Sequence, residues 1–459
     1  MSEEIAVIGG GVFLPPGHFS EKRILKQFQL HNPEYKMALG MRQKGKFVPV
    51  PNQYINACHK IPFDHPWGGG IAIPRRGAFK LLNMSGSHDR TTAPEADPVQ
   101  VAKGFELRDY QREALKNWHE NANGEGVIVA PCGSGKTAMG LTAVTMRNTK
   151  ALILVHTNDL AVQWMNRCKS MLDTEATQYG AGKKDDSGRI VVATFQTLER
   201  MSFTERYSFG QQFGLCIVDE AHHVPAHTFC SVMFCMPARY RLGLTATPDR
   251  PDGLTKMLWW HLGEAVYHIT NSQLARSGHV IPPKIEWLFT DFIGTEKQID
   301  WSKLITTMTK DDGRNDVILN RVLSACEEGR QILILSDRVD HCIWIADTLR
   351  SHSIAAEPLV GKMTKKQRAE VLERADKREI QVVCATTVAD EGLDLPSLDT
   401  VVLTTPTKAL GRIQQRIGRV MRPHPKKKHP IVIDCVDDIG SMRGLARKRN
   451  RLYTRIGCQ

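Results

Sequence analysis

The sequence predicts an α/β fold with two tandem, doubly wound parallel-sheet domains and a small N-terminal domain that is β-rich or mixed. Between residues 127 and 438, short apolar, β-branched runs alternate with helical stretches, the pattern of parallel sheets buried on both faces. These runs form two groups, separated by Ser-Gly and Pro-Pro pairs within Asn271–Pro283. Gly and Pro break the first hundred residues every few positions, which indicates short strands and turns.

We therefore expect three domains, at residues 1–98, 99–275 and 276–459. The chain of 459 residues is long enough for about three domains of ordinary size. In the first domain, Lys46–Val50 and Gly70–Pro74 resemble strands. Asn83–Gln100 is polar, contains two prolines and lacks apolar periodicity, so we expect a linker there.

Each strand expected in the two larger domains is a short apolar run that precedes a turn and a helical stretch. The first group comprises Val127–Ala130, Ala151–His156, Ile190–Phe195, Leu215–Val218 and Arg241–Thr245. The second group comprises Gln331–Ser336, Ile380–Ala385, Thr400–Thr404 and Pro430–Cys435.

The charge balance favours a polyanionic partner. Lys and Arg number 61 against 49 Asp and Glu, a net charge of +12. Residues 1–80 carry +6 and residues 421–459 carry +7, so the excess lies at the two ends of the chain. Tyr54, Phe63 and Trp67 could stack on exposed bases; their packing in the core of the small domain is an equal alternative.

No run of 18 apolar residues occurs, so nothing in the sequence resembles a membrane segment. Nothing in it resembles a signal peptide either. The eleven cysteines are scattered, which suits free thiols in a reducing compartment. We therefore expect a cytoplasmic protein without a membrane partner. His222, His223, His227 and Cys230 lie close together, but they lack the paired spacing of a structural zinc site.

A phosphate-binding loop follows the first of these strands. Ala130-Pro-Cys-Gly-Ser-Gly-Lys-Thr137 connects a strand to a helix expected over Lys136–Arg147, as a P-loop requires. Backbone N–H groups of Gly133, Ser134 and Gly135 would receive phosphates, Lys136 would neutralise them, and Thr137 would ligate Mg²⁺. The first glycine of the usual motif is replaced by Ala130.

An acidic pair ends another strand of the same group. Asp219 and Glu220 follow Leu215–Val218, at the strand end where doubly wound sheets bind their ligands. Asp219 would hold the metal and Glu220 would polarise the attacking water. Such a pair alone is often a solvated loop, whereas after a P-loop the functional interpretation dominates.

Six motifs in order resemble those of superfamily 2 helicases and translocases of the DEAH-box type, from about Phe105 to the C-terminus. They are LRDYQ at 107–111, GSGKT at 133–137, DEAH at 219–222, TATP at 245–248, ATTVADEGLD at 385–394 and QRIGRVMR at 415–422. The resemblance implies two RecA-like domains that use ATP and Mg²⁺. It assigns nucleotide contacts to Arg108, Gln111, Gly392 and Asp394.

The same resemblance assigns roles around the ATP site. Arg419 and Arg422, three residues apart on an expected helix, would act as arginine fingers. Gln415, a further catalytic candidate, would couple the ATP site to Thr245–Thr247. His222, Thr245 and Thr247 would couple ATP hydrolysis to movement. A basic surface helix is the alternative for the arginines alone.

The family implies DNA contacts at the ends of strands, where hydroxyls and amides suit sugar-phosphate recognition. The residues at matching positions are Thr157, Thr194, Gln196, Ser336, Arg338 and Thr386. Thr and Ser at such positions are more often helix caps. Thr364, for example, fits a capping box with Gln367.

Within the superfamily, LRDYQREAL and DEAHHVPA are most similar to XPB and to phage fork-remodelling helicases of the UvsW type. We therefore expect a monomeric DNA translocase that unwinds or migrates forks and junctions, with replication or recombination proteins as partners. By analogy with the family, we expect it to move 3′ to 5′. Residues 1–98 would recognise the DNA branch. An RNA helicase, a motor subunit of a restriction or nuclease system, and an ATP-independent DNA-binding module are the alternatives.

Overall fold

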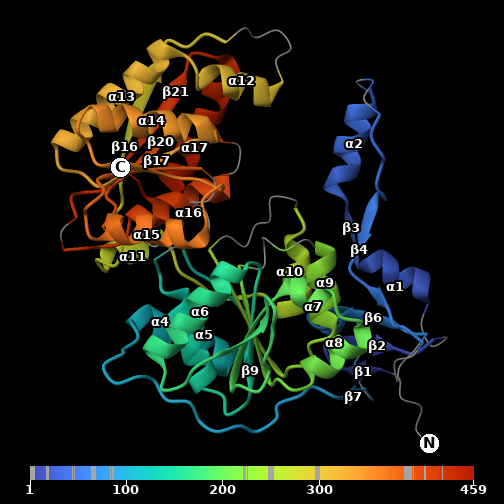
Figure 1. Cartoon of the computed structure of the whole chain (residues 1–459). Helices are drawn as coiled ribbons and strands as arrows, with labels where there is room; N and C mark the ends of the chain where they lie inside the picture. The colour runs from blue at the N-terminus through green and yellow to red at the C-terminus, as the bar shows by residue number, and fades with distance from the viewer. Residues whose placement is uncertain are drawn as a thin grey trace, which may run out of the picture. The chain divides into compact units, whose positions relative to one another are not determined.

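The computed structural model divides the chain into two compact units, Met1–Ala130 with Gly135–Ile269, and Thr270–Gln459 with Pro131–Ser134 (Figure 1). The structure describes residues 6–16, 20–43, 45, 47–63, 69–82, 84, 87–131, 133–220, 224, 226–246, 253–294, 300–386, 395, 397–407, 410–425 and 427–458. Within these ranges, the side chains of residues 365, 411, 412, 415 and 419 are not described.

An eight-stranded sheet forms the centre of the first unit. Its order is β11 (Lys183–Lys184), β10 (Thr177–Gly180), β12 (Ile190–Thr194), β9 (Ala151–Val155), β13 (Leu215–Asp219), β14 (Tyr240–Thr245), β8 (Glu125–Val129) and β15 (Ala265–His268). Every neighbouring pair is parallel except β10 and β11. All five strands expected in this group are confirmed within two residues.

Helices connect these strands, as parallel pairing requires. They are α4 (Asp109–Lys116), the π-helical turn η1 (Asn117–Asn121), α5 (Lys136–Thr145), α6 (Asn158–Met171), α7 (Phe195–Glu199), α8 (Phe203–Gly210), α9 (Ala226–Phe234) and α10 (Thr255–Leu262). Helices α5 and α6 contact each other, and α9 contacts both α7 and α10.

The N-terminal residues form a mixed region of strands and helices. A five-stranded sheet has the order β5 (His59–Lys60), β6 (Ile71–Pro74), β2 (Gly11–Leu14), β1 (Val7–Ile8) and β7 (His88–Asp89), and β3 (Gln29–His31) pairs with β4 (Tyr54–Asn56). The helices are α1 (Glu21–Gln27), α2 (Pro33–Gln43) and α3 (Arg75–Leu81).

This N-terminal region shares one hydrophobic core with the large sheet. Phe13, Phe28 and Ile73 belong to the same cluster of buried residues as Val127 in β8 and Leu154 in β9. The N-terminal region reaches this core through helices of the first unit: α3 contacts α10, and β5 and β6 contact α9. The burial of this shared core holds the region in place.

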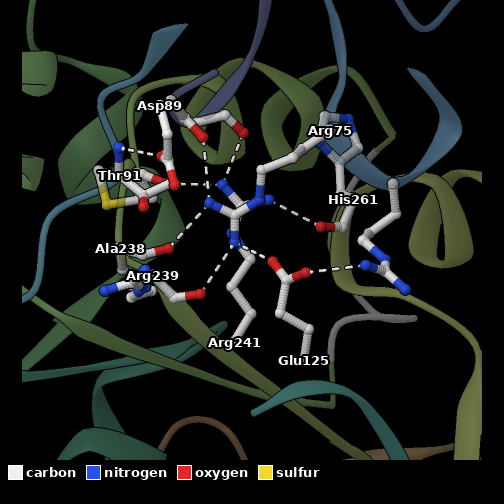
Figure 2. Close-up of polar contacts among 12 residues, drawn as sticks. Arg75, Asp89, Thr91, Glu125, Ala238, Arg239, Arg241 and His261 are labelled. Carbon is white, nitrogen blue, oxygen red and sulfur yellow. Dashed lines mark hydrogen bonds and ion pairs between the residues drawn. The ribbon is translucent and has the colours of Figure 1, made fainter. Parts of the chain in front are cut away.

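Buried arginines reinforce this packing (Figure 2). Arg75 of α3 pairs with Glu125 of β8, and Arg241 of β14 lies beside them without exposure to solvent. The two guanidinium groups donate to carbonyl oxygens of Gly9, Ala238, His261, Gly10 and Met236 at 2.6 to 3.1 Å. Burial would raise the pKa of Glu125, but the nearby arginines outweigh it and hold that pKa below its usual value.

Two local expectations in this part of the chain differ from the structure. Residues 47–50, expected as a strand, form none; Pro49 and Pro51 remove backbone donors there. In the expected linker, His88 and Asp89 form β7, and Thr92 and Glu95 make isolated bridges to Ala238 and Thr149. Backbone pairing needs no apolar pattern, so the sequence could not reveal it.

The second unit contains a six-stranded, fully parallel sheet. Its order is β16 (Lys284–Thr290), β21 (Ile431–Asp437), β20 (Thr400–Leu403), β17 (Ile332–Leu335), β19 (Val382–Ala385) and β18 (Ala356–Leu359). The helices are α11 (Asn271–Arg276), α12 (Trp301–Met308), α13 (Asp312–Glu327), α14 (Val339–Ser351), α15 (Lys365–Asp376), α16 (Leu410–Val420) and α17 (Gly440–Ile456). The predicted α/β class with two parallel sheets is confirmed.

Candidate functional site

The candidate site lies at the carboxyl edge of the first unit's sheet. Strands β12, β9, β13, β14 and β8 are parallel neighbours in that order, so their carboxyl ends share one edge. Thr194, Asp219 and Thr245 end three of these strands, and Ala130 directly follows β8. The topology therefore places the P-loop and the acidic pair at the ligand-binding edge typical of open α/β sheets.

The P-loop has the backbone that its glycines predict. Gly133 and Gly135 have φ of +84° and +78°, in the left-handed region that favours glycine. A Cβ on Gly135 would also come within 2.3 Å of Nε2 of Gln111. The Oε1 atom of Gln111 accepts a hydrogen bond from the Arg108 backbone at 2.9 Å. The first unit thus brings the expected nucleotide-contacting glutamine against the P-loop.

Lys136 and Glu220 meet across this loop. The Lys136 ammonium lies 3.1 Å from Oε1 of Glu220 and donates to the Ala130 carbonyl at 3.2 Å. Both side chains are mostly buried, with 13% and 12% exposed. Thr137 is the second residue of α5 and is half-buried. The P-loop lysine, the threonine expected to bind the metal and the acidic pair therefore gather at one place.

Asp219 is buried at the end of β13. The Trp164 indole donates to its Oδ2 at 2.8 Å, whereas Oδ1 has no hydrogen-bond partner within the part of the chain that the structure describes. Burial and the charge of Glu220 raise the pKa of Asp219 to about 7, against the opposing effects of Lys136 and Trp164. A buried carboxylate oxygen without a partner fits a divalent cation, since Mg²⁺ prefers oxygen ligands.

Glu220 has a strained backbone. Its φ of +48° lies in the left-handed region, which a non-glycine residue seldom adopts. Its N–H donates to the Leu244 carbonyl at 2.9 Å, and its Oε2 accepts from the Ala246 N–H at 3.3 Å. Thr245 lies between Leu244 and Ala246 in the sequence. Its backbone carbonyl accepts a hydrogen bond from the Ala130 N–H at 2.8 Å. Backbone bonds therefore join the acidic pair, the P-loop and the expected coupling threonine.

The DNA-contact candidates of the first unit lie at helix starts. Thr157 caps α6 by accepting from the Leu160 N–H at 3.3 Å, and Thr194 caps α7 by accepting from the Thr197 N–H at 3.2 Å. Gln196 is exposed in the first turn of α7. Both threonines have the capping role that their sequence positions allowed.

In the second unit, Ser336 and Thr386 follow the neighbouring strands β17 and β19 and are largely buried, with 3% and 8% exposed. The Ser336 N–H donates to the Ala385 carbonyl at 3.1 Å. Arg338 donates to the Thr306 hydroxyl at 3.0 Å and to the Ser302 carbonyl at 2.7 Å. These three DNA-contact candidates therefore cluster at one end of the second sheet.

One expectation for the arginine motif is wrong. Helix α16 ends at Val420, so Arg422 lies beyond it, and the argument that Arg419 and Arg422 share a helix face does not hold. The residue before a proline is disfavoured in a helix, and Pro423 follows Arg422. The side chain of Arg419 is not described.

Several expected site residues lie outside the described residues. They are His222 and Thr247 of the coupling set, Gly392 and Asp394 of the nucleotide set, and the side chain of Gln415 in α16. Among the described residues, no cluster of three or more His, Cys, Asp or Glu could hold a metal ion. No helix in those ranges is long and apolar enough to cross a bilayer.

Trp164 is the residue that sequence reasoning missed. A buried indole N–H usually has a hydrogen-bond partner, so the apolar position of this tryptophan in α6 was a signal. Its partner, Asp219, lies 55 residues away in sequence, and only the folded sheet brings them together.

Two family models match the chain. The type III restriction enzyme res subunit model matches residues 104–250, and the helicase conserved C-terminal domain model matches residues 315–424. Together with the P-loop and acidic pair on one sheet edge, these matches support a helicase enzyme that hydrolyses ATP.

Individual relatives agree with this class. DNA 3′-5′ translocase XPB2 of Sulfurisphaera tokodaii is 29% identical over 75% of this chain and 84% of its own length. A protein of Acanthamoeba polyphaga mimivirus, named "Putative ATP-dependent RNA helicase L396", is 28% identical over 84% of this chain and 75% of its own length. The Hef helicase domain of Pyrococcus furiosus matches the fold with a TM-score of 0.50, 18% identity, and coverage of 75% and 98%.

Proposed function

We propose that this chain is an ATP-dependent DNA translocase of the DEAH-box type, similar to XPB and UvsW, that unwinds forks and junctions or migrates their branches, 3′ to 5′. Its place would be in replication, recombination or repair. The observation that carries the choice of DNA is the relationship to a protein named as a DNA 3′-5′ translocase. The choice of branched DNA rests on the motif resemblance and on the basic N-terminal region.

The ATP chemistry follows from the described site. Lys136 and the backbone N–H groups at 133–135 would bind the phosphates, and Arg108 and Gln111 would contact the base. Thr137 and Asp219 would hold Mg²⁺, which neutralises charge that develops on the phosphates. Glu220 would orient the attacking water and accept its proton as the γ-phosphate leaves ADP. The proposal also assigns roles to residues of the second unit. Nucleotide contacts are proposed at Gly392 and Asp394, and catalytic roles at Gln415, Arg419 and Arg422.

Movement would follow from alternating grips on the nucleic acid. His222, Thr245 and Thr247 would transmit the state of the ATP site. DNA contacts are proposed at Thr157, Thr194, Gln196, Ser336, Arg338 and Thr386. Residues 1–98 would recognise the branch, residues 99–275 and 276–459 would form the two motor domains, and the enzyme would act as a cytoplasmic monomer with replication or recombination partners.

The test measures ATP hydrolysis by the full chain with forked DNA, plain duplex, single-stranded DNA and RNA. Forked DNA should stimulate most, and K136A should lose at least about 100-fold in kcat because it removes the cation that Glu220 and the phosphates face. Unchanged unwinding or branch migration by K136A would refute the motor proposal.

Two alternatives have an observation of their own. The mimivirus relative is named as an RNA helicase, and the first family model describes a restriction subunit. Strongest stimulation by single-stranded RNA would favour the first. Metal-dependent strand scission would favour the second.

A further inference from the structure

Trp164 joins three parts of the first unit through one buried side chain. It lies in α6, is 1% exposed, and donates its indole N–H to Oδ2 of Asp219 at 2.8 Å. The other carboxylate oxygen, Oδ1, is buried without a hydrogen-bond partner among the described residues. The indole therefore fixes the rotation of the carboxylate and leaves Oδ1 as the oxygen available to a cation or its bound water.

The indole also packs against the helix that follows the P-loop. A Cβ on Gly140 of α5 would come within 2.6 Å of Cη2 of Trp164, so glycine at this position permits the close approach. Helix α6 begins directly after its cap, Thr157. Trp164 lies seven positions after Thr157, about two helical turns or ~10 Å.

We propose that Trp164 is a positioning residue that orients Asp219 for its metal and links this carboxylate to the nucleic-acid end of α6. The inference rests on the proposed function, which places a DNA contact at Thr157. A shift of α6 on nucleic-acid binding would move the indole N–H relative to Asp219 and α5. The carboxylate would then change its orientation without any direct contact between nucleic acid and the ATP site.

The chain offers a matched control in Trp118. This tryptophan is also fully buried in the first unit, and its indole donates to the Arg241 carbonyl at 3.0 Å. W164F and W118F each remove one buried indole N–H and leave an aromatic ring. Equal losses of thermal stability are compatible with a purely structural role, so the decisive readout is equilibrium binding.

The first measurement is the Mg²⁺ dependence of fluorescent ADP binding. W164F should raise the half-saturating Mg²⁺ concentration about tenfold, the range found when a partner of a metal ligand is removed. W118F should change it less than about twofold. G140A keeps the indole but forces it away from α5, and it should raise the Mg²⁺ requirement in the same direction.

The second measurement is made on the unsubstituted chain, and the two variants serve only to assign its signals. In the full chain labelled with 5-fluorotryptophan, the ¹⁹F signal of Trp164 should shift on addition of Mg²⁺ and ADP and again on addition of forked DNA. The Trp118 signal should stay in place. Loss of one signal in each variant assigns the two among the eight tryptophans.

Equal Mg²⁺ dependence of ADP binding in W164F and W118F would overturn the inference. A Trp164 signal that shifts neither with Mg²⁺ and ADP nor with forked DNA would also overturn it. These outcomes with an inactive K136A would leave the motor proposal intact. Unchanged unwinding by K136A would instead remove the proposed function itself.

Discussion

Glu220 has an unusual backbone at the point where β13 ends. A residue other than glycine held at positive φ costs roughly 1 to 3 kcal/mol, and bonds to Leu244 and Ala246 hold Glu220 there. The conformation turns the carboxylate towards Lys136, 3.1 Å away. Strain of this kind is typical of functional sites.

His341 is a buried histidine in the second unit. Its Nδ1 lies 3.0 Å from the Ser336 hydroxyl and its Nε2 lies 3.1 Å from Oδ1 of Asn315. Asn315 donates its amide to the Thr309 carbonyl at 3.1 Å, so Oδ1 faces the imidazole. A neutral ring that donates from Nε2 and accepts at Nδ1 satisfies both partners. Burial, aided by the charge of Arg314, lowers the pKa of His341 to about 3.

This histidine should make folding stability fall in mild acid. Its unfolded pKa is near 6.5, so its contribution is complete above that pH and is lost as the pH falls towards 3. Between pH 7.5 and 5.5 the loss is about 1.4 kcal/mol, because only the unfolded state gains the proton.

The H341Q variant should lack this pH-dependent loss of folding stability, whatever its own stability at pH 7.5. Urea titrations of both proteins at the two pH values measure it. A wild-type chain that loses no more stability than H341Q over this interval would contradict a neutral, buried His341.

At the scale of elements, α3 fastens the N-terminal region to the large sheet. Arg75 begins this helix and is 1% exposed, paired with Glu125 and bonded to three carbonyl oxygens. R75M would leave Glu125 with fewer cations and those carbonyls without their donor. We expect a loss of about 3 to 5 kcal/mol in unfolding free energy, the usual cost of removing one partner of a buried ion pair.

The control for R75M lies on the same helix. Lys80 also pairs with a carboxylate of the first unit, Glu264, but both side chains are more than half exposed. K80A should cost less than about 1 kcal/mol, because solvent screens exposed pairs. Thermal unfolding of the two variants measures the difference, and equal shifts would mean that Arg75 does not anchor the region.

Elements were predictable where local patterns decide them. Apolar runs located the central strands, and Thr364 forms the expected capping box with Gln367 at the start of α15. Strands at or next to the sheet edges, namely β10, β11, β15, β16 and β18, were missed, because partly exposed strands have no distinctive apolar periodicity. The expected helix extended past Val420, where α16 ends, because it was placed from the spacing of Arg419 and Arg422 and the effect of Pro423 was not considered.

At the scale of the whole molecule, the basic residues of α17 (Gly440–Ile456) divide into a buried one and exposed ones. Arg449 of α17 is buried and pairs with Asp434 at 2.7 and 2.8 Å, and the Tyr453 hydroxyl donates to the same carboxylate at 2.6 Å. Arg447, Lys448 and Arg451 of the same helix are exposed. The exposed residues are free to meet phosphates, whereas Arg449 stabilises the second unit.

Replacing Arg447, Lys448 and Arg451 together by glutamine should weaken DNA binding. The slope of log K for DNA binding against log salt concentration should become shallower by about 0.9 for each phosphate contact that is lost. Thermal stability should change little. Fluorescence anisotropy with duplex DNA over a range of salt concentrations measures this. R449Q is the counterpart that should lower stability, and an unchanged salt slope in the triple variant would remove α17 from the DNA surface.

The sequence by itself determined the α/β class, the order of the motifs and the identity of the P-loop and acidic pair, because these depend on short patterns in adjacent residues. Only the tertiary structure decided that the N-terminal region shares the core of the first sheet and that Trp164 holds Asp219. Both depend on partners far apart in the chain. Their contacts arise from the packing of faces and strand ends, which a local pattern does not specify.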